Sequence, residues 1–120
     1  MMEEKQSISK LKLLVTIVNR GKGSEVTEFL KEFGVNCQTI CLGYGTADSE
    51  LLSYLGLGET EKEIVLSLIT EEDHQRAFPA LADKMQLGRV GHGVAFSIEL
   101  NSVGGPRTYE FFSGRSERED

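Results

Sequence analysis

Long apolar runs are missing from this 120-residue sequence. The longest mostly apolar stretch, residues 11–18, is far shorter than the roughly 20 residues that a membrane-spanning helix needs. The first ten residues are polar and include Glu3 and Glu4, whereas a secretory signal has a basic start followed by an apolar segment. We therefore expect a cytoplasmic protein that does not insert into membranes.

Positive charge is also scarce, because 13 Lys and Arg stand against 19 Asp and Glu and give a net charge of -6. The basic residues are scattered along the chain, and no stripe of aromatic and basic residues suited to stacking on bases is present. A negative chain without a basic patch repels phosphate backbones and anionic lipids. Nucleic acid is therefore not an expected partner.

Cysteine and histidine occur only twice each. Cys37 and Cys41 lie four residues apart in an expected strand, so their side chains would share a face at a separation of roughly 13 Å. That distance excludes a disulfide between them within one straight strand, and we expect two small buried apolar side chains. His74 follows three acidic residues, but acidic side chains in the first turn of a helix are explained by the helix dipole.

Catalytic signatures are absent too. No serine or cysteine is accompanied by a histidine and an acid in a recognisable motif. The sequence therefore predicts no catalytic residue and no resident metal, and it favours a binding protein over an enzyme.

The first half of the chain predicts a strand, a helix and a second strand. Residues 11–18 are rich in β-branched side chains and end at a turn signal with Gly21, which indicates a largely buried strand. Ser24 is a suitable N-cap for a helix that would end at Gly34. The apolar stripe of that helix would consist of Val26, Phe29, Leu30 and Phe33.

The next segments are a second strand over residues 35–42 and a long connection over residues 46–62. A connection of this length inside a compact domain is usually functional. A third strand is expected over residues 63–69, and Thr70 with Asp73 three residues later is typical of the start of a helix. Pro79 lies inside that second helix, where we expect a kink.

A glycine-rich loop over residues 87–93 then leads into a clear alternation of apolar and polar residues from Val94 to Leu100, which predicts a fourth strand. Strand, helix, strand, strand, helix, strand is the ferredoxin-like βαββαβ order. We expect an α+β sandwich, with two helices on one face of an antiparallel sheet. Residues such as Phe96 and Leu100 on the other face need cover, and self-association is its simplest source.

The domain boundaries follow from this pattern. Residues 1–9 are expected to form a flexible N-terminus, residues 10–105 the folded domain, and residues 106–120 a largely flexible C-terminal extension.

Over roughly residues 11–103 the chain resembles the PII family of nitrogen-regulatory signalling proteins. Gly43-Tyr44-Gly45 before a long loop is similar to the GFG motif that opens the family's T-loop, which here would span residues 46–62. Lys62 stands at the far end of that loop, and LGRVGHG over residues 87–93 is similar to the family's TGKIGDG B-loop. The resemblance implies a homotrimer that binds an adenine nucleotide, such as ATP, ADP or AMP, in clefts between subunits.

Carried over residue by residue, the resemblance implies a set of effector-binding residues, of which the glycines supply backbone N–H groups for an anion. The set consists of Gly43, Gly45, Lys62, Gly88, Arg89, Gly91 and Gly93. The family reports its ligand through the T-loop, which docks on a regulated protein such as a membrane transporter or a metabolic enzyme.

The chain departs from the family pattern at several basic positions. Thr46, Ala47, Val94 and Gly105 stand where the family has a polar or cationic residue, and Arg107 alone remains near a C-terminal arginine position. A less charged nucleotide, or another anion altogether, therefore remains open. The predicted T-loop is also about four residues shorter than is usual, and its Tyr54 does not align cleanly with the family's modified tyrosine.

Two alternatives remain open at this point. A trimeric copper-tolerance module has a similar topology and would use Cys37, Cys41 or His92 for a soft metal. A structural trimer without a ligand is the other.

Overall fold

The fold is described from a computed structural model, which describes residues 10–44 and 61–104. The predictions for residues 1–9, for most of the 46–62 loop and for residues 106–120 lie outside the described residues, as do Gly45, Tyr54 and Gly105.

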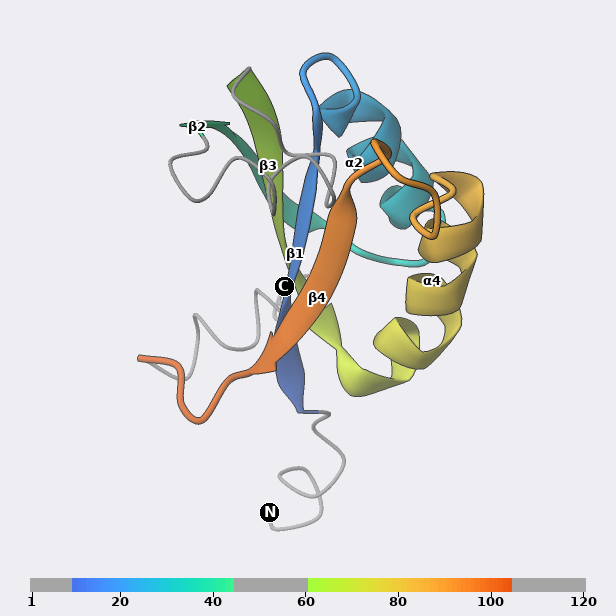
Figure 1. Cartoon of the computed structure of the whole chain (residues 1–120). Helices are drawn as coiled ribbons and strands as arrows, with labels where there is room; N and C mark the ends of the chain where they lie inside the picture. Colours follow the sequence, from blue (N-terminus) through green and yellow to red (C-terminus); the bar gives the residue numbers. More distant parts are fainter. Residues whose placement is uncertain (1–9, 45–60, 105–120) are drawn as a thin grey trace, which may run out of the picture.

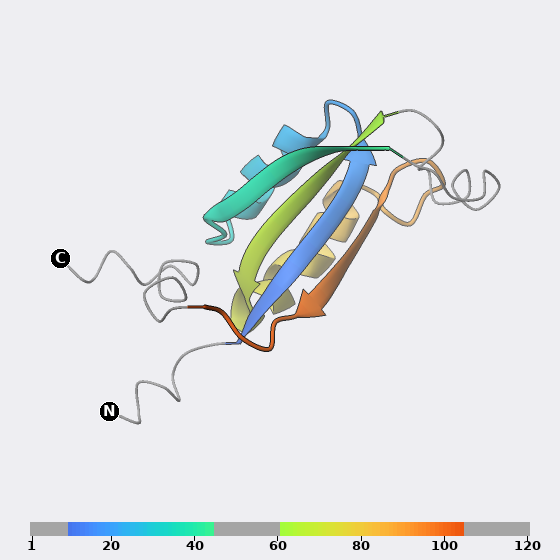
Figure 2. The ribbon, with the colours of Figure 1, turned by 90° about the vertical axis from the view of Figure 1, so that its left-hand side faces the viewer.

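Four strands form one antiparallel sheet in the order β2-β3-β1-β4. Both helices lie against the same face of this sheet (Figures 1 and 2). The predicted α+β, ferredoxin-like βαββαβ arrangement is therefore confirmed. The elements in chain order are β1 (Leu11–Asn19), α2 (Gly23–Lys31), β2 (Cys37–Tyr44), β3 (Glu61–Thr70), α4 (Glu71–Lys84) and β4 (Val94–Glu99).

The main core lies between the sheet and the helices, because one stripe of each helix and alternate residues of β1 and β3 are apolar. Burying a large aliphatic side chain of this kind contributes roughly 1.5–3 kcal/mol. The buried members of this core are Leu14, Val18, Val26, Leu30, Val35, Val65, Ile69, Ala77 and Leu81.

Helix α2 begins differently from the prediction. It starts at Gly23 instead of after Ser24, and Lys22 at the N-cap position makes no side-chain capping bond. The Gly23 N–H instead donates to Glu63 Oε1 at 2.7 Å. A Cβ at position 23 would lie 2.5 Å from that oxygen, so glycine lets the carboxylate reach the helix from β3.

Other boundaries shift by a few residues. Helix α2 ends at Lys31, and Phe33 lies in the turn that leads to Gly34, whose φ of +89° is the left-handed conformation expected of a helix-ending glycine. Val35 packs into the core below the helix, so β2 begins two residues later than predicted and continues to Tyr44.

The predicted start of α4 is confirmed, because Thr70 Oγ1 accepts the Asp73 N–H at 3.2 Å. Pro79 lies within α4, which is continuous from Glu71 to Lys84. No helix within residues 10–44 and 61–104 is long and apolar enough to cross a membrane.

The second face of the sheet, called the open face below, carries no described helix (Figure 2). The strand register places its side chains in three rows that run across all four strands. Thr39 is the single polar member of these rows, and Phe96 and Ile98 are 44% and 49% exposed. The rows are Cys37-Leu68-Leu13-Ile98, Thr39-Leu66-Val15-Phe96 and Cys41-Ile64-Ile17-Val94.

The prediction that both cysteines are buried is wrong. Cys37 and Cys41 are unpaired thiols of intermediate exposure on the open face. They are not fully enclosed because β2 is an edge strand, with β3 on one side and no described strand on the other.

His74 lies in the first turn of α4, where its ring packs against an apolar neighbour. Its ring stacks on that of Phe78 with 5.0 Å between the centroids, and its Nε2 is buried without a hydrogen-bond partner among the described residues. Burial, aided by the charge of Lys12 and opposed by Glu71, lowers the pKa of His74 from its usual 6.5. The folded protein therefore holds this side chain neutral near pH 7.

We expect the free energy of unfolding to decrease as the pH falls below about 6.5, because the unfolded chain then binds a proton that folded His74 resists. Chemical denaturation at several pH values between neutral and about pH 5 measures this decrease. In His74→Gln the free energy of unfolding should decrease less over this pH range. The acidic residues are the same in both proteins, so the difference between the two pH profiles reports on His74. Identical pH profiles for the two proteins would contradict the prediction.

Candidate functional site

The candidate site lies at one end of the sheet, where β1 ends, β2 leads into the long loop and β4 begins. Antiparallel pairing places Asn19 opposite Lys62, and Lys62 opposite Gly43. On the other side of β1, Ile17 pairs with Val94, so the glycine-rich loop enters the sheet at this same end. The fold thus brings the described residues that flank the long loop to the same end of the sheet as the glycine-rich loop.

Lys62 is the most enclosed charged residue of the site. It is only 6% exposed, and its Nζ donates to Asn19 Oδ1 at 2.6 Å. A hydrogen bond to a charged group of this kind contributes roughly 1.5–3 kcal/mol. Lys62 was predicted as an effector-binding cation, and the structure places it at the exit of the long loop with its ammonium already hydrogen-bonded.

Asn19 connects Lys62 to the glycine-rich loop. Its Oδ1 accepts from Lys62, and its Nδ2 donates to the Gly91 carbonyl at 3.2 Å. One amide therefore bridges the start of β3 and the loop before β4. Sequence reasoning missed Asn19, and its position as the polar residue that ends an apolar strand is the signal that could have found it.

The glycine-rich loop folds as successive tight turns. The Arg89 N–H donates to the Gln86 carbonyl at 3.1 Å, and the His92 N–H donates to the Arg89 carbonyl at 3.2 Å. Gly91 and Gly93 adopt φ of +91° and +107°, a region that other residues rarely occupy. These turns hold Gly91 at the distance from β1 that the Asn19 bond requires.

The predicted site residues divide into three groups. Lys62, Gly91 and Gly93 lie together around the end of β1. Arg89 and Gly88 are exposed in the same loop, with no side-chain contact recorded to Lys62 among the described residues. Gly43 lies on the facing strand, where a Cβ would meet Ile64 Cδ1 at 2.6 Å, and Gly45 is outside the described residues.

The residues considered for a soft metal are not assembled into a site. Cys37 and Cys41 lie on β2, and His92 is exposed in the glycine-rich loop. Within the described ranges, no three His, Cys, Asp or Glu side chains are grouped so that they could hold a metal ion. The convergence that a copper-tolerance module would need is therefore missing from the described part of one chain.

The fold is similar to two solved structures. Arabidopsis thaliana PII bound to citrate superposes with a TM-score of 0.62 at 18% identity, over 85% of this chain and 88% of that one. A PII-like signalling protein from Thermus thermophilus gives a TM-score of 0.56 at 15% identity, over 77% of this chain and 87% of that one. The chain has the PII fold. The sequence itself matches no protein-family model and no curated protein.

The shared PII fold confirms the resemblance that was inferred from three short motifs. At identities below one fifth, what is shared is the course of the chain, and the site has to be judged from its own residues. The hydrogen bonds from Lys62 through Asn19 to Gly91 are the residues' own evidence for a candidate site at this end of the sheet.

Gly93→Ala should disrupt the glycine-rich loop. A Cβ at position 93 would lie 2.4 Å from the Ile17 carbonyl oxygen, and the backbone has a φ of +107°. We expect a loss of at least about 1–3 kcal/mol in unfolding free energy, because strain adds to the clash. Gly88→Ala is the matched control, since nothing lies within 4 Å of a Cβ there. Urea denaturation compares them, and equal stabilities would refute the assignment.

Asn19→Ala should destabilise the fold by about 1–3 kcal/mol, because it leaves the Lys62 ammonium buried without its acceptor. Lys62→Met keeps the aliphatic stem and removes the charge, so adding it to Asn19→Ala should recover part of the loss. A double-mutant cycle by urea denaturation measures this coupling. Additive effects of the two substitutions would show that the bond contributes nothing.

Proposed function

We propose that this chain is a PII-like signal-transduction protein that binds a small anionic effector and regulates a partner protein through the loop over residues 46–62. The observation that carries the proposal is the bridge from Lys62 through Asn19 to the Gly91 carbonyl. It joins the end of that loop to the glycine-rich loop, so a ligand that binds at either place changes the restraints on the other.

The effector is an anion because the residues available to it are cations and backbone N–H groups. Lys62 and the exposed Arg89 lie at the same end of the molecule, and a guanidinium can bind a phosphate or carboxylate through two parallel bonds. An anion that draws the Lys62 ammonium away from Asn19 would free the Asn19 amide. An adenine nucleotide is the effector that the resemblance to the PII family implies, and citrate is a second probe because it is the ligand named for the Arabidopsis protein.

The effector clefts would lie between subunits of a homotrimer. The open face supports assembly, because apolar rows across four strands end in Phe96 and Ile98 with nearly half of their surface exposed. Burial of such a surface against further copies of the chain is favourable at about 25 cal/mol per Å². The regulated partner would be a membrane transporter or a metabolic enzyme, reached by the 46–62 loop.

Titration calorimetry with ATP, ADP, AMP, cyclic nucleotides, bicarbonate and citrate tests the effector. We expect saturable binding of at least one of them, with a loss of tenfold or more in Arg89→Ala and in Lys62→Met, since tenfold corresponds to about 1.4 kcal/mol. Lys31→Gln, an exposed lysine at the far end of α2, is the charge-matched control. Binding of none of these ligands, or equal losses in all three variants, would reject the proposed site.

Light scattering after gel filtration tests the assembly. The full chain should elute as a trimer, and Phe96→Asp should dissociate it by placing a charge on the open face. Val90→Asp is the control, because Val90 is 69% exposed in the glycine-rich loop and lies outside the three rows. A monomeric wild-type chain would refute the trimer.

A further inference from the structure

A hollow of about 360 Å³ lies beside the candidate site, within a single protomer. It is open to solvent on one side and is bordered by the end of β1, the start of α2, the last turn of α4 and the loop that follows α4. Its size is at the lower end of the range found for small-molecule sites. Asn19 and Gly91 form one wall, so the hollow adjoins the bridge that links the two loops.

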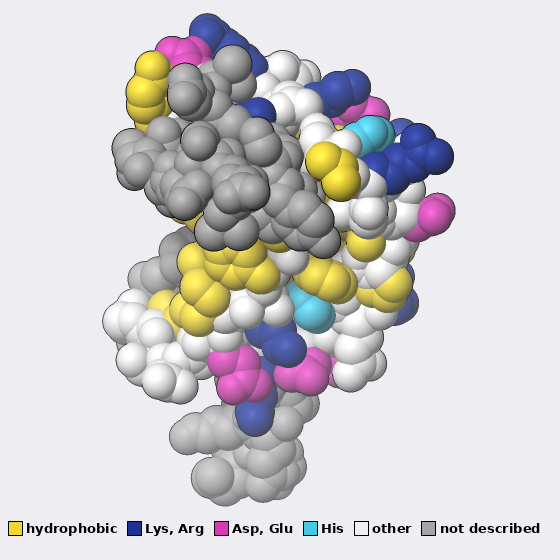
Figure 3. Space-filling view, in the orientation of Figure 1, with side chains coloured by type: hydrophobic (Ala, Val, Ile, Leu, Met, Phe, Trp, Pro, Cys, Tyr) yellow, Lys and Arg dark blue, Asp and Glu magenta, His cyan; other side chains and the backbone are white. Residues whose placement is uncertain are grey.

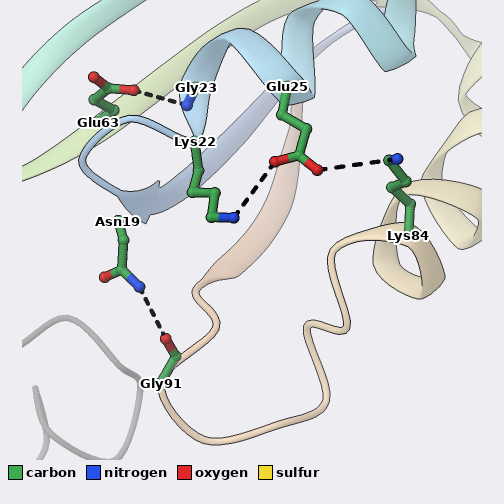
Figure 4. A network of polar contacts seen from close by, with 7 residues as sticks. All are labelled: Asn19, Lys22, Gly23, Glu25, Glu63, Lys84 and Gly91. Carbon is green, nitrogen blue, oxygen red and sulfur yellow. Dashed lines mark hydrogen bonds and ion pairs between the residues drawn. The ribbon is translucent and has the colours of Figure 1, made fainter.

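The charged lining of this hollow converges on one carboxylate. Glu25 lies between two lysines, with Lys22 Nζ at 3.6 Å from Oε1 and Lys84 Nζ at 4.0 Å from Oε2 (Figure 4). Both distances exceed the roughly 2.7–2.9 Å of a charge-assisted hydrogen bond. The two ammonium groups are therefore only loosely neutralised, and each retains N–H donors for another acceptor.

Both lysine side chains are partly exposed, Lys22 by 57% and Lys84 by 43%. Lys84 Nζ lies 5.8 Å from the centre of the Phe29 ring, within the range of a cation–π contact. The opposite side of the α2 start is occupied, because the Gly23 N–H is bonded to Glu63 (Figure 4). Lys22 and Lys84 thus reach the same carboxylate, one from the residue before α2 and the other from the last turn of α4.

The loop after α4 begins with Gln86, which lines the hollow. Gln86 has a φ of +54° and is the one non-glycine residue with a positive φ among those described. This left-handed residue ends the helix, because the Leu87 N–H then donates to the Ala82 carbonyl at 2.9 Å. Gln86 and His92 supply further hydrogen-bonding groups to the lining. In the space-filling view, Lys and Arg side chains gather on this upper right part of the surface (Figure 3).

We infer that this hollow is a second binding site, for a compact anion with two or more negative charges. Lys22 and Lys84 would each pair with one acidic group of the ligand, in competition with Glu25. The two ammonium groups lie on either side of one carboxylate, so a compact phosphate or a di- or tricarboxylate is the ligand that can pair with both. No Phe, Tyr or Trp side chain lines the hollow within the described residues, and His92 supplies the one ring of the lining.

The site goes beyond the proposed function, because it lies within one protomer and uses neither Lys62 nor Arg89. It is nevertheless adjacent to the proposed effector site, since the loop segment that contains Gly91 lines the hollow and accepts the Asn19 bond. A bound anion would hold that segment against α2 and α4. A ligand in the hollow would therefore restrain the glycine-rich loop in addition to the Asn19–Gly91 hydrogen bond.

Titration calorimetry at low ionic strength tests the inference, with inorganic phosphate, citrate and monovalent acetate as probes. We expect phosphate or citrate to bind at least tenfold more tightly than acetate, and whichever binds more tightly identifies the class of ligand. Lys22→Gln and Lys84→Gln should each weaken that binding by about tenfold or more, and Lys31→Gln, with the same charge change, should not. Glu25→Gln should strengthen it, because the competing carboxylate is removed.

The outcomes separate this site from the proposed effector site. Arg89→Ala should leave anion binding in the hollow unchanged while it weakens nucleotide binding, and Lys84→Gln should do the reverse. Circular dichroism and thermal melting of each variant establish that it is folded. Binding no tighter than that of acetate, an equal loss in Lys31→Gln, or weaker binding in Glu25→Gln would overturn the inference.

Discussion

The hydrogen bond between Lys62 Nζ and Asn19 Oδ1 is the constraint on which the end of the sheet depends. A lysine that is only 6% exposed is tolerated in a protein when a polar acceptor compensates for the lost hydration of its ammonium group. Here the acceptor belongs to the last residue of β1, and the same side chain holds the glycine-rich loop through Gly91. A single buried charge thus determines where three segments of the chain meet.

The two faces of the sheet have opposite roles. One face is packed under α2 and α4 around a compact core, which provides the stability of a single chain. The three rows of the open face are almost entirely apolar, and its edge strand carries two thiols of intermediate exposure. Among the described residues no helix covers this apolar face, and for that reason assembly and ligand clefts belong to the same proposal.

Much of the fold could be predicted from periodicity. The alternation after Val94, the Thr70 cap and Gly34 at the helix end all reflect local physics, and each was found in the structure. The start of α2 could not be predicted, because its first N–H is satisfied by a carboxylate forty residues away in β3. Contacts of that kind depend on strand register, which a single sequence does not reveal.

The candidate site was predictable in part for the same reason. Glycine-rich loops and the exit lysine can be recognised in a sequence, and the structure places Gly91, Gly93 and Lys62 together at the end of β1. Their part in binding an effector stays a prediction. Asn19 was missed because its role arises only when β1 is paired with β3 and the glycine-rich loop is folded back. Exposure of the cysteines was misjudged because the sequence does not say which strand lies at the edge.

The first three residues of β3 have a mechanical consequence. Glu61 contacts Arg20, Lys62 bonds Asn19 and Glu63 caps α2 at Gly23, so three consecutive side chains fasten the strand on both faces of the sheet. A slip of β3 by two residues would keep every side chain on its correct face, yet it would break all three attachments at once. The register of β3 is therefore fixed at this end. A force that acts on β3 at Glu61 acts on β1 and α2 as well, because the strand cannot slide past them without breaking these three contacts.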